Sequence, residues 1–265
     1  MGRTLPGWAR DDQCRGGRLA RRGVFYFTPS SPARYAVVRV LKSAARRPLP
    51  VLPAAAALPA AAPALDGSQP LPGSEHLRFR CNGCGDCCRL LRVALTHHDL
   101  RRLSEGLGQA AATLVEWLAP SEVDMTGEPG SFVRLTRGRR LMVLAQSEGA
   151  CRLLTPDQRC SAYALRPLDC RLFPFDLERD AQGRPLRLSR LDAKGCGDEQ
   201  GEAAALAEIS AQDAQRWHEL ADYQRQLQRW NRVAEHRLRS GRRPGEAADF
   251  LAFLGFARAP SPTTG

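Results

Sequence analysis

Nine cysteines stand in this 265-residue chain, and four of them fall within eight residues as Cys-x2-Cys-x2-Cys-Cys. Thiolates this close repel one another unless they share a cation, so the crowding predicts a metal centre. Asn, Gly and Asp separate the four, whereas apolar residues would surround buried core thiols. The set comprises Cys81, Cys84, Cys87 and Cys88.

Four further cysteines follow at Cys151, Cys160, Cys170 and Cys196, and Cys14 stands apart near the N-terminus. Cys151 and Cys160 flank a Pro-Asp turn, a geometry in which two thiols can share one metal. These later thiols could instead be buried core residues, a common role for cysteine. The eight clustered and distal cysteines predict either two metal sites or one cluster with additional thiols.

The triple Cys-x2-Cys-x2-Cys puts three thiols on one glycine-containing loop whose amides can point at sulfur. Three ligands with a distant fourth are typical of a [4Fe–4S] cluster, whereas structural zinc more often takes two separated pairs. We therefore expect Cys81, Cys84 and Cys87 to share one centre, an iron–sulfur cluster in preference to zinc. Cys88 is harder to place, because adjacent side chains diverge and rarely bind the same mononuclear ion.

Two segments together carry the pattern of a known family. Residues 79–88 read Phe-Arg-Cys-Asn-Gly-Cys-Gly-Asp-Cys-Cys, and residues 160–174 read Cys-Ser-Ala-Tyr-Ala-Leu-Arg-Pro-Leu-Asp-Cys-Arg-Leu-Phe-Pro. The pair resembles the CxxCxxCC family of zinc- or iron-chelating domains, also called YkgJ-like cysteine-cluster proteins, over residues 77–197. The resemblance implies a metal-chelating domain, with the eight cysteines other than Cys14 as its metal ligands.

Tyr163 and Arg166 lie in the second of these segments and are candidate cofactor-binding residues. Arg166 could hold an anionic substrate or tune a cluster by its charge. Its simpler role is to neutralise thiolates or to cap a backbone carbonyl near the metal.

The helices expected in the cysteine-rich part are short. Thr96 and Asp99 form a capping-box pair that opens one helix, and residues 110–118 predict a second. His97-His98 at the first helix start could supply a nitrogen ligand. Because eight cysteines are available, we expect the two histidines to be exposed residues near the helix cap instead.

Alternating apolar residues predict two hairpins, one from residues 132–135 and 141–145 and one from residues 174–177 and 185–188. Apolar residues at three- and four-residue steps over residues 211–238 predict a long amphipathic helix capped by Ser210. A short apolar helix is expected after Gly245. The fold class is therefore α+β, a small irregular metal-stabilised domain with hairpins and helices and a C-terminal helical segment.

The predicted organisation has four parts. Residues 1–75 are rich in Ala, Pro, Arg and Gly and lack apolar periodicity, which predicts a disordered tail or an over-long gene start. Residues 76–199 form the cysteine-cluster domain, 200–240 the amphipathic helical segment, and 241–265 a short helix and tail.

Charge and hydropathy limit the expected partners and compartment. The formal net charge is +11, but residues 1–75 hold eleven basic and only four acidic residues, so the basicity belongs mostly to the tail. The remainder lacks a basic stripe interleaved with aromatics, so nucleic-acid binding is not expected. Prolines interrupt the apolar run at residues 51–65, and no segment approaches the length of a spanning helix. We expect a cytoplasmic monomer without membrane contact, and leave a protein partner open.

Three functions fit these features. The first is a metal-binding module in electron transfer or metal handling, favoured because no other catalytic groups converge in the sequence. The second is an iron–sulfur-dependent protein-modifying enzyme, since the flagellin lysine methylase carries a similar cysteine cluster, although no S-adenosylmethionine loop is recognisable here. The third is a zinc-ribbon-like nucleic-acid adaptor, for which Asp86, Asp99 and Glu105 dilute the arginines around the cluster too strongly.

Overall fold

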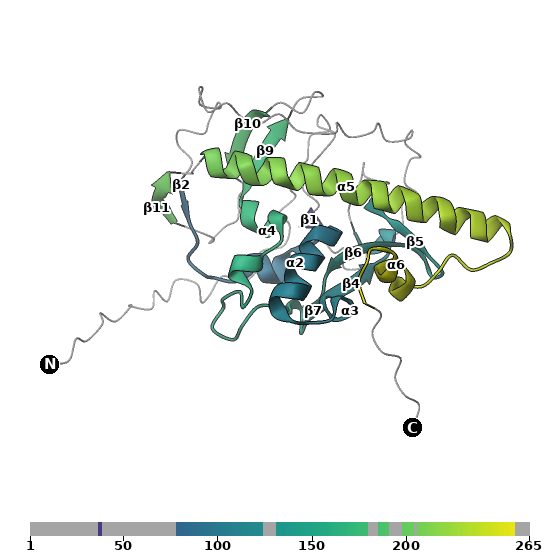
Figure 1. Ribbon diagram of the computed structural model, residues 1–265. Coiled ribbons are helices and arrows are strands. Elements are labelled where there is room, and N and C mark those ends of the chain that lie inside the picture. The colour runs from purple at the N-terminus through teal and green to yellow at the C-terminus, as the bar shows by residue number, and fades with distance from the viewer. Residues whose placement is uncertain are drawn as a thin grey trace.

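A computed structural model describes residues 37–38, 78–123, 131–179, 185–190, 198–203 and 206–257. It contains helices and small antiparallel sheets, which confirms the α+β class (Figure 1). The helices are α1 (Asp86–Leu90), α2 (His97–Leu107), α3 (Ala111–Leu114), α4 (Leu168–Leu172), α5 (Leu206–Arg239) and α6 (Ala247–Phe253), with 3-10 turns at Pro120–Glu122 and Tyr163–Leu165. The strands are β1 (Val37–Val38), β2 (Arg78–Arg80), β3 (Arg92–Val93), β4 (Val115–Leu118), β5 (Val133–Leu135), β6 (Gly138–Leu144), β7 (Gln146–Ser147), β8 (Ala150–Cys151), β9 (Phe175–Arg179), β10 (Pro185–Arg190) and β11 (Asp198–Ala203).

Strand β6 is the centre of an antiparallel sheet with the order β4-β6-β5. The predicted hairpin of β5 and β6 is confirmed. The expected helix over residues 110–118 is wrong in its second half, because Val115–Leu118 forms β4 and pairs with β6. Val, Trp and Leu favour a pleated, half-buried surface, and the sheet offers these residues a partner strand that a sequence pattern cannot see.

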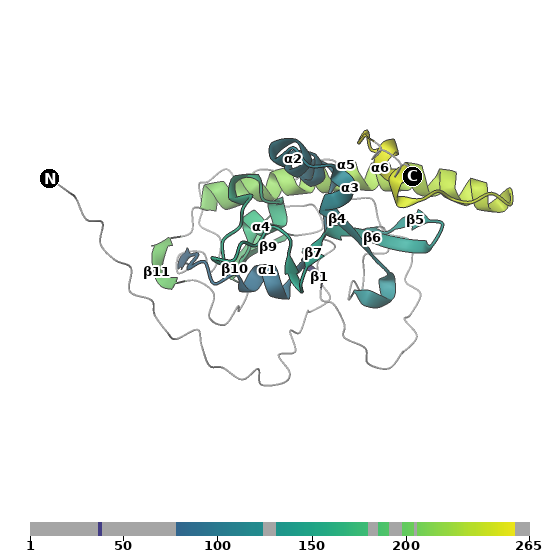
Figure 2. The same ribbon diagram turned by 90° about the horizontal axis from the view of Figure 1, so that it is seen from below.

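Helix α5 crosses the whole described molecule and covers the sheet and helices α2 and α4 (Figures 1 and 2). The long amphipathic helix is confirmed, but it starts at Leu206, so Ser210 lies buried within it and does not cap it. Asn231 fixes α5 to the edge of β5, since its Oδ1 accepts from the Arg134 N–H at 2.7 Å and its Nδ2 donates to the Phe132 carbonyl at 2.9 Å. The apolar face of α5 joins one core cluster through Tyr223, Leu227, Trp230 and Ala234.

Helix α6 is the short C-terminal helix that the sequence predicts, and it packs into the same core. Phe250 is fully buried, with its ring 5.3 Å from that of Trp230 and 6.0 Å from that of Trp117. Phe250→Ala should therefore lower the free energy of unfolding by about 3–5 kcal/mol, measured by chemical denaturation. Phe253 on the same helix is 37% exposed, so Phe253→Ala serves as the control. A similar loss in both variants would contradict this view of the core.

Two further strand pairs lie near the N-terminal end of α5 (Figure 1). The predicted hairpin is confirmed by β9 and β10, whose intervening turn lies outside the described residues. Strand β11 pairs with β2, with Asp198 opposite Arg80. In the predicted tail, β1 pairs with β3, and the rest of residues 1–75 lies outside the described ranges. Among the helices described, none is both long and apolar enough to cross a bilayer.

Candidate metal centre

The Cys-x2-Cys-x2-Cys-Cys loop runs directly into α1, so Cys87 and Cys88 lie in the first turn of a helix. Their Sγ atoms are 4.0 Å apart. Gly85 precedes α1 with φ of 72°, a left-handed conformation that glycine adopts without a steric penalty. The Arg89 guanidinium donates to the Cys84 carbonyl at 3.0 Å and also to the Gln158 side chain. These contacts fasten the loop to the turn that joins Cys151 to Cys160.

That turn presents the second pair of thiols. Strand β8, which ends at Cys151, packs beside α1, and Cys160 bridges to Leu154 across the turn. The Thr155 N–H donates to the Arg159 carbonyl at 2.8 Å, which closes the turn. The predicted Pro-Asp turn therefore holds its two cysteines toward the first loop.

Five thiols from separate segments interact with one another. Cys88 is hydrogen-bonded to Cys87 and Cys151 and interacts electrostatically with Cys160, while Cys170 interacts with Cys87 and Cys88. Loop, turn and α4 thus bring residues up to 83 positions apart to one place. Every cysteine in the described ranges is a thiol and not half of a disulfide.

Crowding and burial keep most of these thiols protonated in the absence of a cation. The hydrogen bond to Cys88, followed by burial, raises the pKa of Cys87 far above the usual value. The hydrogen bond to Cys151 raises the pKa of Cys88 to about 11, and the same bond lowers the pKa of Cys151. Burial is the main cause that raises the pKa of Cys170 well above its usual value. A soft cation bound by these sulfurs would stabilise the thiolates, so the donor set fits zinc or iron.

Arg166 lies beside this thiol group. It bonds a backbone carbonyl and also places its positive charge near a thiol, the two simpler roles that the sequence predicts for it. Its Nε donates to the Tyr163 carbonyl at 3.0 Å, and its guanidinium stacks over the Tyr163 ring at 3.7 Å. Its positive charge lowers the pKa of Cys87, opposing the other influences on that thiol. Tyr163 itself is 57% exposed, so one partner of this stacked pair faces solvent.

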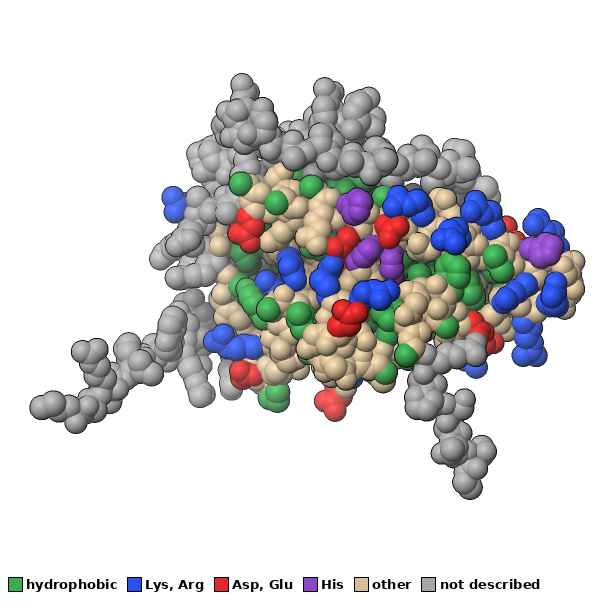
Figure 3. Space-filling view, viewed as in Figure 1, with side chains coloured by type: hydrophobic (Ala, Val, Ile, Leu, Met, Phe, Trp, Pro, Cys, Tyr) green, Lys and Arg blue, Asp and Glu red, His purple; other side chains and the backbone are tan. Residues whose placement is uncertain are grey.

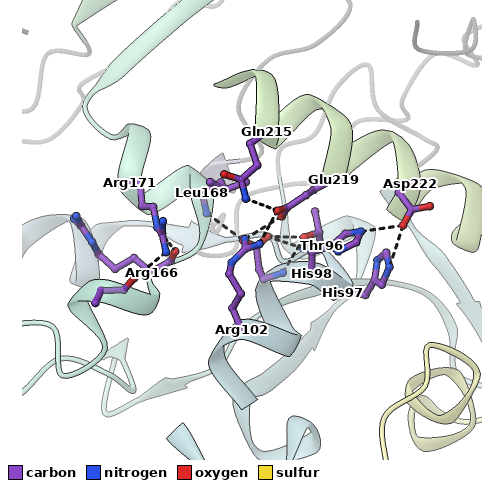
Figure 4. A network of polar contacts seen from close by, with 12 residues as sticks. Thr96, His97, His98, Arg102, Arg166, Leu168, Arg171, Gln215, Glu219 and Asp222 are labelled. Carbon is purple, nitrogen blue, oxygen red and sulfur yellow. Dashed lines mark hydrogen bonds and ion pairs between the residues drawn. The ribbon is translucent and has the colours of Figure 1, made fainter. Parts of the chain in front are cut away.

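Helix α4, which carries Cys170, is held by carboxylates on both sides. Asp99 Oδ1 accepts from the Leu168 N–H at 3.1 Å, and Asp169 accepts from Arg216 Nε of α5 at 2.5 Å. The side chains that link α2, α4 and α5 lie together in Figure 4. Sequence reasoning recognised Asp99 only as a helix cap and missed Asp169 and Arg216. The one local sign that Asp99 belongs to a polar network was its i,i+3 spacing from Arg102, which permits an ion pair on a helix.

The predicted ligands are not all brought together. Cys81 is exposed at the start of the loop, and Cys196 lies outside the described residues. Within the described ranges, no three thiols have all their sulfurs within 4.8 Å of one another. The ligand set of eight cysteines therefore stays a prediction.

Gly85 and Gly83 offer a matched test of how the loop is positioned. Both have a positive φ, but a Cβ at Gly85 would lie 2.9 Å from Arg89 Nη1 and 3.2 Å from Leu154 Cδ1, whereas a Cβ at Gly83 meets nothing within 4 Å. Gly83→Ala should cost about 1–2 kcal/mol of backbone strain. Gly85→Ala should cost more and should also lower the metal content per chain, measured after purification under identical conditions. Equal effects of the two changes would show that the contact with the turn does not matter.

The geometry defines this part of the chain as a thiol-rich α+β domain. The family model CxxCxxCC, described as a putative zinc- or iron-chelating domain, matches residues 80–187. The predicted resemblance is therefore confirmed over the loop, the turn and α4. No curated protein and no solved structure matches the chain.

Proposed function

We propose that this protein holds an iron–sulfur cluster through its cysteines and acts in electron transfer or metal handling. The proposal depends mainly on one observation, the meeting of Cys87, Cys88, Cys151, Cys160 and Cys170 beside the positive charge of Arg166. A cluster of this kind supplies reversible one-electron chemistry when bound. The chain contributes the thiolates and, in Arg166, a cation that offsets their charge.

The spacing of the thiols supports a polynuclear centre. Two thiolates on one tetrahedral zinc ion lie about 3.8 Å apart, since each Zn–S bond is about 2.3 Å. Among the described cysteines, no three sulfurs meet even a 4.8 Å limit. A cluster distributes its thiolates over several irons and so accepts wider spacing and more than four nearby cysteines.

Zinc is the second candidate, and one distance favours it. Cys87 Sγ and Cys88 Sγ are 4.0 Å apart, close to the separation expected for two ligands of one zinc ion. This arrangement differs from the expectation that adjacent side chains diverge.

Strand pairing supports including the outer cysteines in the ligand set. Asp198 is the first described residue after Cys196. It pairs with Arg80, the residue that immediately precedes Cys81. We propose that Cys81, Cys84 and Cys196 complete the ligands. An iron–sulfur-dependent protein-modifying enzyme is the alternative role, for which the exposed Tyr163 and the partly buried Arg166 would contact the substrate.

Metal and acid-labile sulfide per chain, together with the visible spectrum of protein purified without oxygen, test the proposal. Iron with matching sulfide and a colour that bleaches on reduction would support the cluster. Zinc without sulfide would exclude it and leave the zinc-binding alternative. Protein that binds neither metal after reconstitution with iron and sulfide or with zinc would overturn both.

A further inference from the structure

Two histidines and an aspartate, none of them part of the thiol group, meet where α2 crosses α5. His98 Nε2 lies 2.9 Å and His97 Nε2 3.3 Å from the same oxygen, Asp222 Oδ2. All three donor atoms lie within 4.8 Å of one another, and the two rings are 4.0 Å apart (Figure 4). In the space-filling view, histidine and acidic side chains gather in the middle of this face (Figure 3).

The fold holds these donors in a fixed relation. Thr96 caps α2 immediately before the two histidines, and Asp99 completes the capping box. Arg102 on α2 donates to both oxygens of Glu219, one turn before Asp222 on α5, at 2.6 and 2.9 Å. The approach of α2 to α5 is therefore set next to the donors by a buried two-point contact.

The exposed position expected for the histidines is wrong for His97, which is only 7% exposed. Its ring packs 5.8 Å from that of the buried Tyr223, whose hydroxyl has no partner among the described residues. His98 and Asp222 remain partly open to solvent. The three donors thus form a site with one enclosed side and one side open to water or a further ligand.

We propose that His97, His98 and Asp222 form a second, thiol-independent site for a borderline divalent cation such as Zn²⁺. Two donors at about 2.0–2.2 Å from one tetrahedral ion lie about 3.3–3.6 Å apart. The distance from His97 Nε2 to Asp222 Oδ2, 3.3 Å, matches this separation, and the 2.9 Å contact of His98 would lengthen slightly when the ion binds. Two imidazoles and one carboxylate with an open position are a known donor set for zinc and for non-haem iron.

The charges around the site are compatible with a cation. Arg225 Nη2 donates to Asp222 Oδ1 at 3.0 Å, which leaves Oδ2 facing the imidazoles. Arg101 also faces His97, whereas Asp222 and Glu219 offset its charge. Burial, followed by the neighbouring His98, lowers the pKa of His97 to about 4, so this imidazole is neutral near pH 7, the form that binds metal.

The test counts Zn²⁺ bound by the full chain whose cysteine-held metal has already been measured, using equilibrium dialysis. Wild-type protein should bind one further equivalent, and His98→Ala and Asp222→Asn should weaken that equivalent at least tenfold. Asp222→Asn keeps the shape and an acceptor oxygen, so its fold should persist, as circular dichroism would verify. His218→Ala, which changes an exposed histidine on α5, is the matched control and should bind as wild type does.

Cobalt separates this site from the thiols. Co²⁺ added to the same protein should give visible d–d bands without the near-ultraviolet charge transfer of a thiolate ligand, and these bands should be lost in His98→Ala. The proposal is overturned if wild type binds no further equivalent, if both His98→Ala and Asp222→Asn keep it, or if the added Co²⁺ shows thiolate charge transfer. In the first case Asp222 is simply a hydrogen-bond partner of the two imidazoles.

Discussion

Cys84→Ser should remove most of the metal from the protein, whereas Cys14→Ser should change neither metal content nor stability. A serine hydroxyl is a much weaker ligand than a thiolate for zinc or iron, and metal binding contributes directly to folding in small metal domains. The main-chain contacts of Cys84, from its N–H to Asn82 Oδ1 at 3.2 Å and from Arg89 to its carbonyl at 3.0 Å, survive the change. The variant therefore tests the sulfur and not the shape of the loop.

Two measurements check this result. Elemental analysis of anaerobically purified protein gives the metal per chain, and amide hydrogen exchange shows whether protection falls across residues 77–197. Cys14 stands in the proline- and alanine-rich N-terminal sequence, so its variant controls for the general loss of one thiol. Full metal content in Cys84→Ser would remove Cys84 from the predicted ligands.

Arg102→Met should destabilise the fold by about 3–5 kcal/mol, because it leaves two buried carboxylates without their cation. Arg102 bonds Asp99 at 2.5 Å and Glu219 at 2.6 Å, and the two acidic residues are only 4% and 6% exposed. Methionine keeps the length and apolar stem of arginine but supplies no donor. Since Asp99 also accepts from the Leu168 N–H, the helix that carries Cys170 should loosen as well.

Urea denaturation at neutral pH measures the loss, and hydrogen exchange in α4 measures the loosening. Arg232→Met changes an exposed arginine on α5 and should alter stability by less than about 1 kcal/mol, as expected for surface charges. If Arg102→Met were as stable as Arg232→Met, the buried network would not be what joins α2 to α5. If Arg102→Met lowered the stability but the amides of α4 stayed protected from exchange, a contact other than the one through Asp99 would position Cys170.

The parts of the fold that could be predicted have signals contained in a few consecutive residues. The capping box of Thr96 and Asp99, the β5–β6 hairpin and the period of α5 all follow from local spacing, and all are confirmed. The errors come from long-range partners. Residues 115–118 became a strand because β6 lies beside them, and α5 extends back past Ser210 to Leu206.

For the candidate site, the sequence alone determined the class of chemistry. Four cysteines in eight residues, with the second segment around Cys170, are enough to specify a zinc- or iron-chelating domain, because ligand type and close spacing are local properties. Only the tertiary structure brought Cys87 and Cys88 to Cys151, Cys160 and Cys170, and set Arg166 beside them. It alone also placed Asp222 against two histidines that precede it by more than a hundred residues. Such meetings depend on how a helix packs across the domain, and that packing is decided by the whole core and not by any one segment.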